Sequence, residues 1–129
     1  MRQVLSPDDL KKGDLVEPGW YPATISDYTE EEAKTDKSTN CIFHFKLDMP
    51  EGHPAKGVSP RRLFNEKALG FGKNLWAALK FPYDPKTGYE LTTQLFKQTI
   101  GSKVMIYIKR GKSDKGNDFN DVQDFREVS

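Results

Sequence analysis

The segment Cys41–Leu47 alternates along its whole length between two sets of side chains. One set is Cys41, Phe43, Phe45 and Leu47, and the other is Ile42, His44 and Lys46. A period of two residues is typical of a β-strand with one face packed against a hydrophobic core. The segment therefore predicts a half-buried strand whose core face carries the first set.

Four other segments have the character of short strands, and one has helical spacing. The strand segments are Trp20–Tyr28, Gly57–Phe64, Val104–Lys109 and Phe119–Val128. Apolar residues recur at helical spacing in Asn65–Phe81, between the third and fourth strands, although Gly70 and Gly72 weaken its first turns. Five strands with a helix between the third and the fourth is the layout of the OB-fold, a partly open Greek-key barrel. We therefore predict one OB-fold domain over residues 1–129, with residues 1–18 as an irregular lead-in.

Length and composition limit the classes of protein to consider. The chain has 129 residues, which is enough for one hydrophobic core of ordinary size. It contains no apolar run near the length of about 18 residues that a membrane span needs, and no signal-peptide pattern. Its one cysteine, Cys41, cannot form a disulfide within the chain. These features favour a cytoplasmic protein.

The distribution of charge says more than the net charge of +1. Residues 1–36 hold nine acidic and four basic side chains. Residues 56–80 hold six basic side chains and one acidic, and residues 97–116 repeat that ratio. Two basic segments that converge in space would attract the phosphates of a nucleic acid. Ordinary solvated surface charge is the alternative reading.

Binding to single-stranded nucleic acid requires aromatic surfaces for base stacking and cations along the phosphates. The outward positions of the predicted strands provide both, and the OB-fold binds oligonucleotides over its second and third strands. The candidates are Trp20 and Tyr28 on the first strand, His44 and Lys46 on the second, Arg61 and Arg62 on the third, Tyr107 and Lys109 on the fourth, and Lys112 in the following loop. Pro60 leaves open which of the two arginines points outward.

Several aromatic and polar residues also have a structural alternative. Trp20 could pack against the lead-in, and His44 could be an ordinary surface histidine. Phe119, beside the last loop, could either stack on a base or pack inside the domain. Trp76 on the helix is predicted to be a core residue at the open end of the barrel.

Five motifs follow one another along the chain. They are Gly19-Trp20-Tyr21-Pro22-Ala23-Thr24-Ile25, Phe43-His44-Phe45-Lys46-Leu47, the glycine-flanked helix with Leu75-Trp76, Ile100-Gly101-Ser102-Lys103-Val104, and Asn120-Asp121-Val122 followed by Phe125. In this order they span about residues 13–128 and resemble small phage-encoded OB-fold single-stranded-DNA-binding proteins. The resemblance implies single-stranded DNA binding during phage replication or recombination in the bacterial cytoplasm, without catalysis.

The resemblance is incomplete at the end of the sequence. Many phage and bacterial single-strand binders end in a long acidic tail that recruits replication partners. This sequence ends in Arg126-Glu127-Val128-Ser129, so the replication or recombination proteins that it would meet are left open. A preference for DNA over RNA is also left open, as is a homodimer formed through an exposed strand edge.

The sequence contains no pattern that indicates an enzyme. Two histidines and one cysteine do not make a recognisable metal-ligand cluster. The segment Gly70-Phe71-Gly72-Lys73-Asn74 lacks the spacing of a P-loop. We therefore expect neither a metal nor a cofactor. The alternative function is a protein-interaction module that uses the same barrel face, for example a phage factor that binds a host enzyme.

Overall fold

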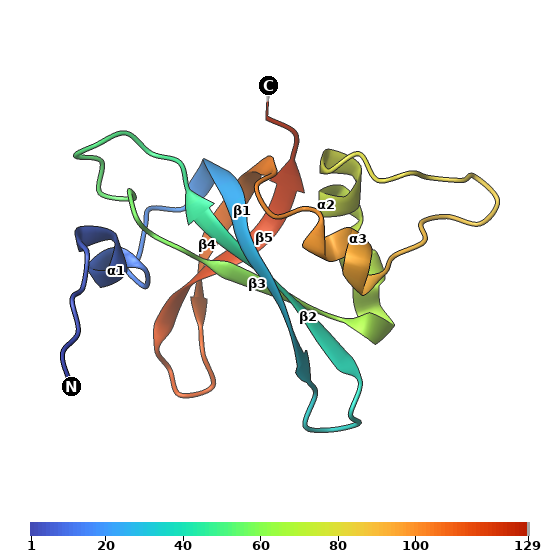
Figure 1. Ribbon diagram of the computed structural model, residues 1–129, viewed down its shortest axis with the longest axis horizontal. Helices are drawn as coiled ribbons and strands as arrows, with labels where there is room; N and C mark the ends of the chain where they lie inside the picture. Colours follow the sequence, from blue (N-terminus) through green and yellow to red (C-terminus); the bar gives the residue numbers. More distant parts are fainter. Residues whose placement is uncertain (129) are drawn as a thin grey trace.

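Five antiparallel strands form one sheet in the order β3-β2-β1-β4-β5 (Figure 1). The strands are β1 (Gly19–Glu32), β2 (Thr39–Leu47), β3 (Arg61–Asn65), β4 (Lys103–Lys112) and β5 (Asp118–Arg126). The computed structural model describes residues 1–128, except for the side chains of Asp8 and Asp9; Ser129, the last residue of the predicted domain, lies outside the described residues. The predicted number of strands and the helical segment between the third and the fourth are confirmed.

The two edge strands, β3 and β5, approach each other without pairing. No backbone ladder joins them in the described part of the chain, so the sheet is curved but not closed into the predicted barrel. The rings of Phe64 and Phe125, from the two edge strands, have centroids 6.2 Å apart. Nη1 of Arg62 donates a hydrogen bond of 2.8 Å to the carbonyl oxygen of Val122. The edges therefore meet through side chains, and the backbone between them stays open.

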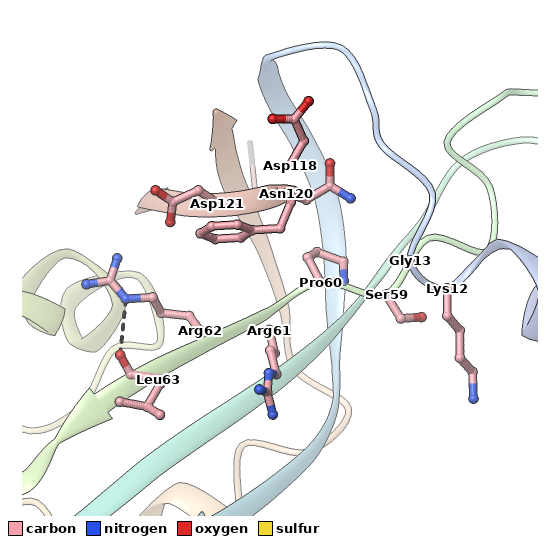
Figure 2. Close-up of a pocket in the computed structure, with 11 residues that line it drawn as sticks. Lys12, Gly13, Ser59, Pro60, Arg61, Arg62, Leu63, Asp118, Asn120 and Asp121 are labelled. Atoms are coloured by element: carbon pink, nitrogen blue, oxygen red, sulfur yellow. Dashed lines mark hydrogen bonds between the residues drawn. The ribbon is translucent and has the colours of Figure 1, made fainter. Parts of the chain in front are cut away.

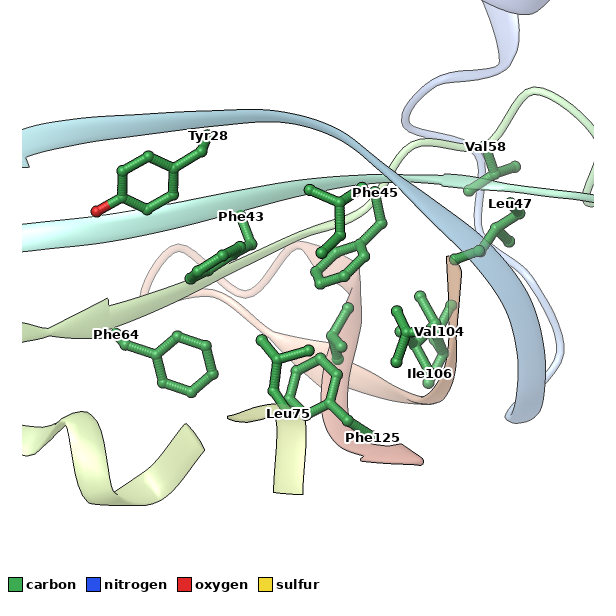
Figure 3. Packing of buried hydrophobic residues seen from close by; sticks show 14 of the residues in the cluster. Tyr28, Phe43, Phe45, Leu47, Val58, Phe64, Leu75, Val104, Ile106 and Phe125 are labelled. Atoms are coloured by element: carbon green, nitrogen blue, oxygen red, sulfur yellow. The ribbon is translucent and has the colours of Figure 1, made fainter. Parts of the chain in front are cut away.

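The core lies on the concave side of the sheet (Figure 3). Phe43 and Phe45 are fully buried, as the alternation in Cys41–Leu47 predicts. Trp76 is also a core residue, with 1% of its surface exposed, and its ring stacks on Phe96 at 5.0 Å. Its indole Nε1 donates to the carbonyl oxygen of Leu69 at 2.9 Å, so its polar atom is satisfied inside the core.

The predicted helix over Asn65–Phe81 is two short helices. A 3₁₀ helix, η1, covers Glu66–Gly72 with non-helical dihedrals at Ala68, and α2 covers Lys73–Ala78. A third short helix, α3 (Thr93–Lys97), precedes β4. None of the helices in the described part of the chain is long and apolar enough to cross a membrane.

The lead-in is more ordered than predicted. It contains the helix α1 (Pro7–Lys11) and then crosses the sheet end, where Val16 is buried. The side chain of Asn120 on β5 accepts from the backbone N–H of Val16 at 3.0 Å and donates to the carbonyl of Asp14 at 2.7 Å. The backbone N–H of Ser59 donates to the carbonyl of Lys12 at 3.0 Å. The lead-in thus joins the chain just before β3 to the start of β5.

A β-bulge in β1 overturns the predicted outward position of Tyr28. The pairing register with β2 shifts between Ile25 and Asp27, which makes Ser26 an extra residue. Residues after a bulge change face relative to those before it. Tyr28 therefore pairs with Phe43 on the inner face, 4% exposed, and burial raises the pKa of its phenol. The prediction that Tyr28 faces a ligand is wrong.

Candidate functional site

An open cleft of about 580 Å³ lies between the two edge strands (Figure 2). We call it the edge cleft. Its lining residues are Lys12, Gly13, Ser59, Pro60, Arg61, Arg62, Leu63, Asp118, Phe119, Asn120 and Asp121. They come from the lead-in, from the two residues before β3, from β3 itself and from the start of β5. The cleft exists because the sheet brings β3 and β5 together without closing.

On the β3 side of the edge cleft, Arg61 provides a positive charge that is not paired with another described side chain. Arg61 is exposed, and within the described residues its guanidinium has no hydrogen bond or ion pair. Leu63, two residues on, is 41% exposed and therefore on the same face of the strand. The wall thus combines an apolar surface with a guanidinium that has all its donors available.

The opposite wall provides an aromatic ring. Phe119 is 43% exposed, and its ring lies against Gly111 of the neighbouring strand, where a Cβ would come within 2.7 Å of Phe119 Cζ. Glycine at position 111 therefore lets one side of the ring lie on the backbone of β4. The aromatic surface that remains exposed contributes to the cleft lining.

The two acidic side chains of the cleft are both engaged by neighbours. Asp118 forms an ion pair with Lys112 at 2.9 Å, which holds the pKa of that carboxyl below its ordinary value. Asp121 accepts a hydrogen bond from the side chain of Gln123. Lys112, a predicted phosphate contact, therefore already has a carboxylate partner.

Arg62 has a different role from Arg61, although the two are adjacent. Their side chains leave β3 in different directions (Figure 2). Arg62 is half-buried, and its guanidinium lies 4.7 Å from the centroid of the Phe64 ring. Its Nη1 reaches the Val122 carbonyl across the gap, and its Nε donates to the carbonyl of Leu63 at 3.3 Å. Arg61 is therefore the outward arginine of the predicted pair, and Arg62 ties the two edges together.

The predicted residues of β2 lie next to this wall, on the convex face. His44 pairs with Arg61 in the β2–β3 register. Its Nε2 is 2.8 Å from the Thr29 hydroxyl. Lys46 is exposed and lies opposite Thr24 of β1. The second and third strands therefore bring together three of the predicted residues, His44, Lys46 and Arg61.

Three further predicted residues, Trp20, Tyr107 and Lys109, lie together with Arg126, which was not predicted. We call these four residues the outer cluster. Trp20 and Tyr107 pair across β1 and β4, with ring centroids 5.3 Å apart. The guanidinium of Arg126 lies 4.3 Å from the Trp20 ring centroid, and Lys109 Nζ lies 5.8 Å from that of Tyr107. None of these four residues lines the edge cleft. The predicted site is thus divided between the two halves of the convex face.

Sequence reasoning missed several residues that the fold brings into the site. Lys12 belongs to the lead-in, for which the sequence contains no contact signal. The sequence does not decide whether Phe119 stacks on a base or packs inside the domain, and in the structure it lies on the wall of the edge cleft. Arg126 is exposed near the end of β5 and lies opposite Met105 of β4. Its contact with Trp20 depends on a third strand, which no local pattern reveals.

The described residues contain no group of three or more His, Cys, Asp or Glu side chains that could hold a metal ion. The edge cleft is suited to binding a ligand, because it combines the aromatic ring of Phe119, the apolar side chain of Leu63 and the unpaired guanidinium of Arg61. No protein-family model matches the chain, and no curated protein matches its sequence.

Proposed function

We propose that this protein binds single-stranded nucleic acid, DNA in the first place, in the edge cleft and over the adjoining face of β2 and β3. The observation that carries the proposal is that an exposed aromatic ring, Phe119, and an uncommitted guanidinium, Arg61, line the same open cleft. Bases stack on an aromatic ring whatever their identity, and a guanidinium binds phosphate with two parallel hydrogen bonds. The proposed binding is therefore tolerant of sequence.

The arrangement of the strands supports this proposal. We infer that the fold is an open variant of the OB-fold, with the five-strand order and the helical segment before β4 as support. OB-folds bind oligonucleotides over strands two and three and in the loops that join strands one to two and four to five. The edge cleft lies between β3 and the start of β5, next to the second of those loops. His44, Lys46 and Arg61 would extend the surface toward the first.

The biological setting in this proposal follows from the resemblance of the sequence motifs. Phage single-stranded-DNA-binding proteins coat and protect DNA during replication or recombination in the bacterial cytoplasm. A binding protein of this kind needs no catalytic group. The proposed role is protection of exposed strands, with replication or recombination proteins as further partners.

Titration of the protein with fluorescent oligo-dT tests this function. We expect binding at about 50 mM salt and a marked loss of affinity at about 200 mM, because phosphate contacts release counterions. Phe119→Ala should weaken binding about 5- to 150-fold, which corresponds to about 1–3 kcal/mol for one stacked base. Tyr83→Ala is the matched control, since Tyr83 is a 62% exposed aromatic outside the cleft.

Two results would count against the proposal. Absence of binding by the parent protein at the lower salt concentration would exclude nucleic acid as its ligand and favour the protein-interaction alternative. Binding that is equally strong in the parent and in Phe119→Ala would show that the edge cleft is not the site.

A further inference from the structure

A second groove continues the edge cleft along β5. We call it the helix groove; its volume is about 500 Å³, and it is lined by Lys67, Ala68, Gly70, Phe71, Lys73, Asn74, Gln123, Asp124 and Phe125. The edge cleft uses residues 118–121 of β5, and the helix groove uses residues 123–125. Val122 lies between the two and accepts the hydrogen bond from Arg62. The two cavities are therefore consecutive along one strand, with the Arg62 bridge between them.

Phe71 is the most exposed aromatic side chain of the described residues, at 79%. It lies between Gly70 and Gly72, in a segment whose backbone contacts the buried ring of Trp76. A Cβ at Gly72 would overlap the Trp76 ring, and Trp76 Nε1 bonds to the Leu69 carbonyl at 2.9 Å. The fully buried Trp76 thus holds the backbone on both sides of Phe71 against the core while the Phe71 ring stays in solvent. An exposed aromatic ring offers a surface on which a base can stack.

The charges around the helix groove suit a phosphate backbone. Lys73, two residues after Phe71, is exposed, and within the described residues its ammonium group has no hydrogen bond or ion pair. The acidic residue of the groove, Asp124, accepts a hydrogen bond of 2.7 Å from Asn74 Nδ2. Lys67 adds a second ammonium, which is paired with Asp36 at 2.7 Å. The uncommitted charge of this groove is therefore cationic.

We propose that the binding site is bipartite: a single strand of nucleic acid that stacks on Phe119 in the edge cleft passes Arg62 and stacks again on Phe71 in the helix groove. Arg62 uses Nε and Nη1 to bond the Leu63 and Val122 carbonyls, and Nη2 takes part in neither bond. In this proposal, that guanidinium nitrogen contacts a phosphate between the two stacked bases. Residues 119 to 124 of an extended strand cover about 17 Å, which is the length of β5 over which the two grooves follow one another. In this proposal the two rings therefore stack on different nucleotides. This inference rests on the proposed function of the edge cleft.

A series of oligo-dT lengths tests the inference. We choose lengths of about 4, 8, 12 and 16 nucleotides, the span of site sizes known for OB-folds. Phe71→Ala should leave the affinity for the shortest oligonucleotide near that of the parent and weaken the longer ones about 5- to 150-fold. Lys73→Gln should reduce the slope of log affinity against log salt by about 0.7 for the longer oligonucleotides, the value for one phosphate contact to a single strand.

The outcomes separate the inference from the proposed function. If Phe119→Ala weakens binding but Phe71→Ala binds every length like the parent, the bipartite site is wrong and the edge cleft remains the site. An equal loss at all lengths in Phe71→Ala also overturns it, because Phe71 would then belong to the minimal site. If the parent binds no oligonucleotide, both proposals fail. Tyr83→Ala again serves as the exposed-aromatic control, and thermal melting verifies that each variant is folded.

Discussion

Arg62 and Val122 join the two edges of the sheet. Nη1 of the arginine on β3 donates a hydrogen bond to the carbonyl oxygen of the valine on β5, with a distance of 2.8 Å between the two atoms. In a closed barrel, a backbone ladder would satisfy that carbonyl. Here a side chain does so, and the backbone on either side of the contact stays apart. This arrangement leaves the edge cleft on one side of Arg62 and the helix groove on the other.

The two arginines of β3 should contribute very differently to the stability of the protein. Arg62→Ala removes a charged hydrogen bond and leaves the Val122 carbonyl without its partner, so we expect unfolding free energy to fall by about 1.5–3 kcal/mol. Arg61→Ala should change stability by less than about 0.5 kcal/mol, because Arg61 is exposed, yet weaken oligonucleotide binding. Urea unfolding and oligo-dT titration of both variants make the comparison. Equal stability losses in the two variants would contradict the assigned roles.

Gly72 should be intolerant of alanine, because an added Cβ would overlap the ring of Trp76. We expect Gly72→Ala to destabilise the protein by about 1–3 kcal/mol, as overpacking of a core does. Gly70→Ala is the matched control, since no atom of the described residues lies within 4 Å of a Cβ at that position. Thermal melts of the two variants should differ clearly, and similar melting temperatures would show that the backbone of η1 adjusts freely around Trp76.

The Glu30 carboxylate should make a pH-dependent contribution to stability. It accepts hydrogen bonds from the Thr93 hydroxyl at 2.6 Å and the Tyr28 phenol at 2.7 Å, and these bonds lower the pKa of Glu30 below its ordinary value of 4.5. A group with a lowered pKa in the folded state stabilises that state above its unfolded pKa. The contribution is lost as the pH falls through the folded pKa.

Thr93→Val tests this linkage. The variant should be less stable than the parent at about pH 7, and the difference should shrink as the pH falls below about 4.5, where protonation of Glu30 weakens the bond in the parent as well. Urea midpoints across that range give the measurement. Thr92→Val is unsuitable as a control, because Thr92 caps α3 through the backbone N–H of Leu95. A stability difference that does not change with pH would contradict the role of the charge.

The outer cluster offers a competing face, and a double substitution compares it with the edge cleft. Tyr107 and Lys109 line no part of the cleft, so Tyr107→Ala with Lys109→Ala should weaken oligo-dT binding less than Phe119→Ala alone. Trp20 lies beside Tyr107, and its fluorescence reports whether DNA reaches that side. A larger loss in the double variant would move the binding face to β1 and β4.

Part of the candidate site followed from local patterns and part did not. The alternation of Cys41–Leu47 correctly placed Phe43 and Phe45 inside and Lys46 outside, since a strand's periodicity is independent of its partners. Ile42, which belongs to the outward set, is fully buried, so the alternation did not predict its burial. The same reasoning failed at Tyr28, because the extra residue at Ser26 is defined by pairing with β2. It also could not separate Arg61 from Arg62, whose directions depend on where β3 begins after Pro60.

By itself the sequence determined the order of the five strands, the inward positions of Phe43 and Phe45 and the burial of Trp76, all of which depend on spacing within a few residues. Only the tertiary structure decided that the sheet stays open and that Phe119 and Phe71 flank consecutive grooves. It also decided that the lead-in closes one end of the cleft. The physical reason is that the curvature of a sheet arises from the twist of all five strands together. The distance between its edges is therefore a property of the whole sheet, which no single segment encodes.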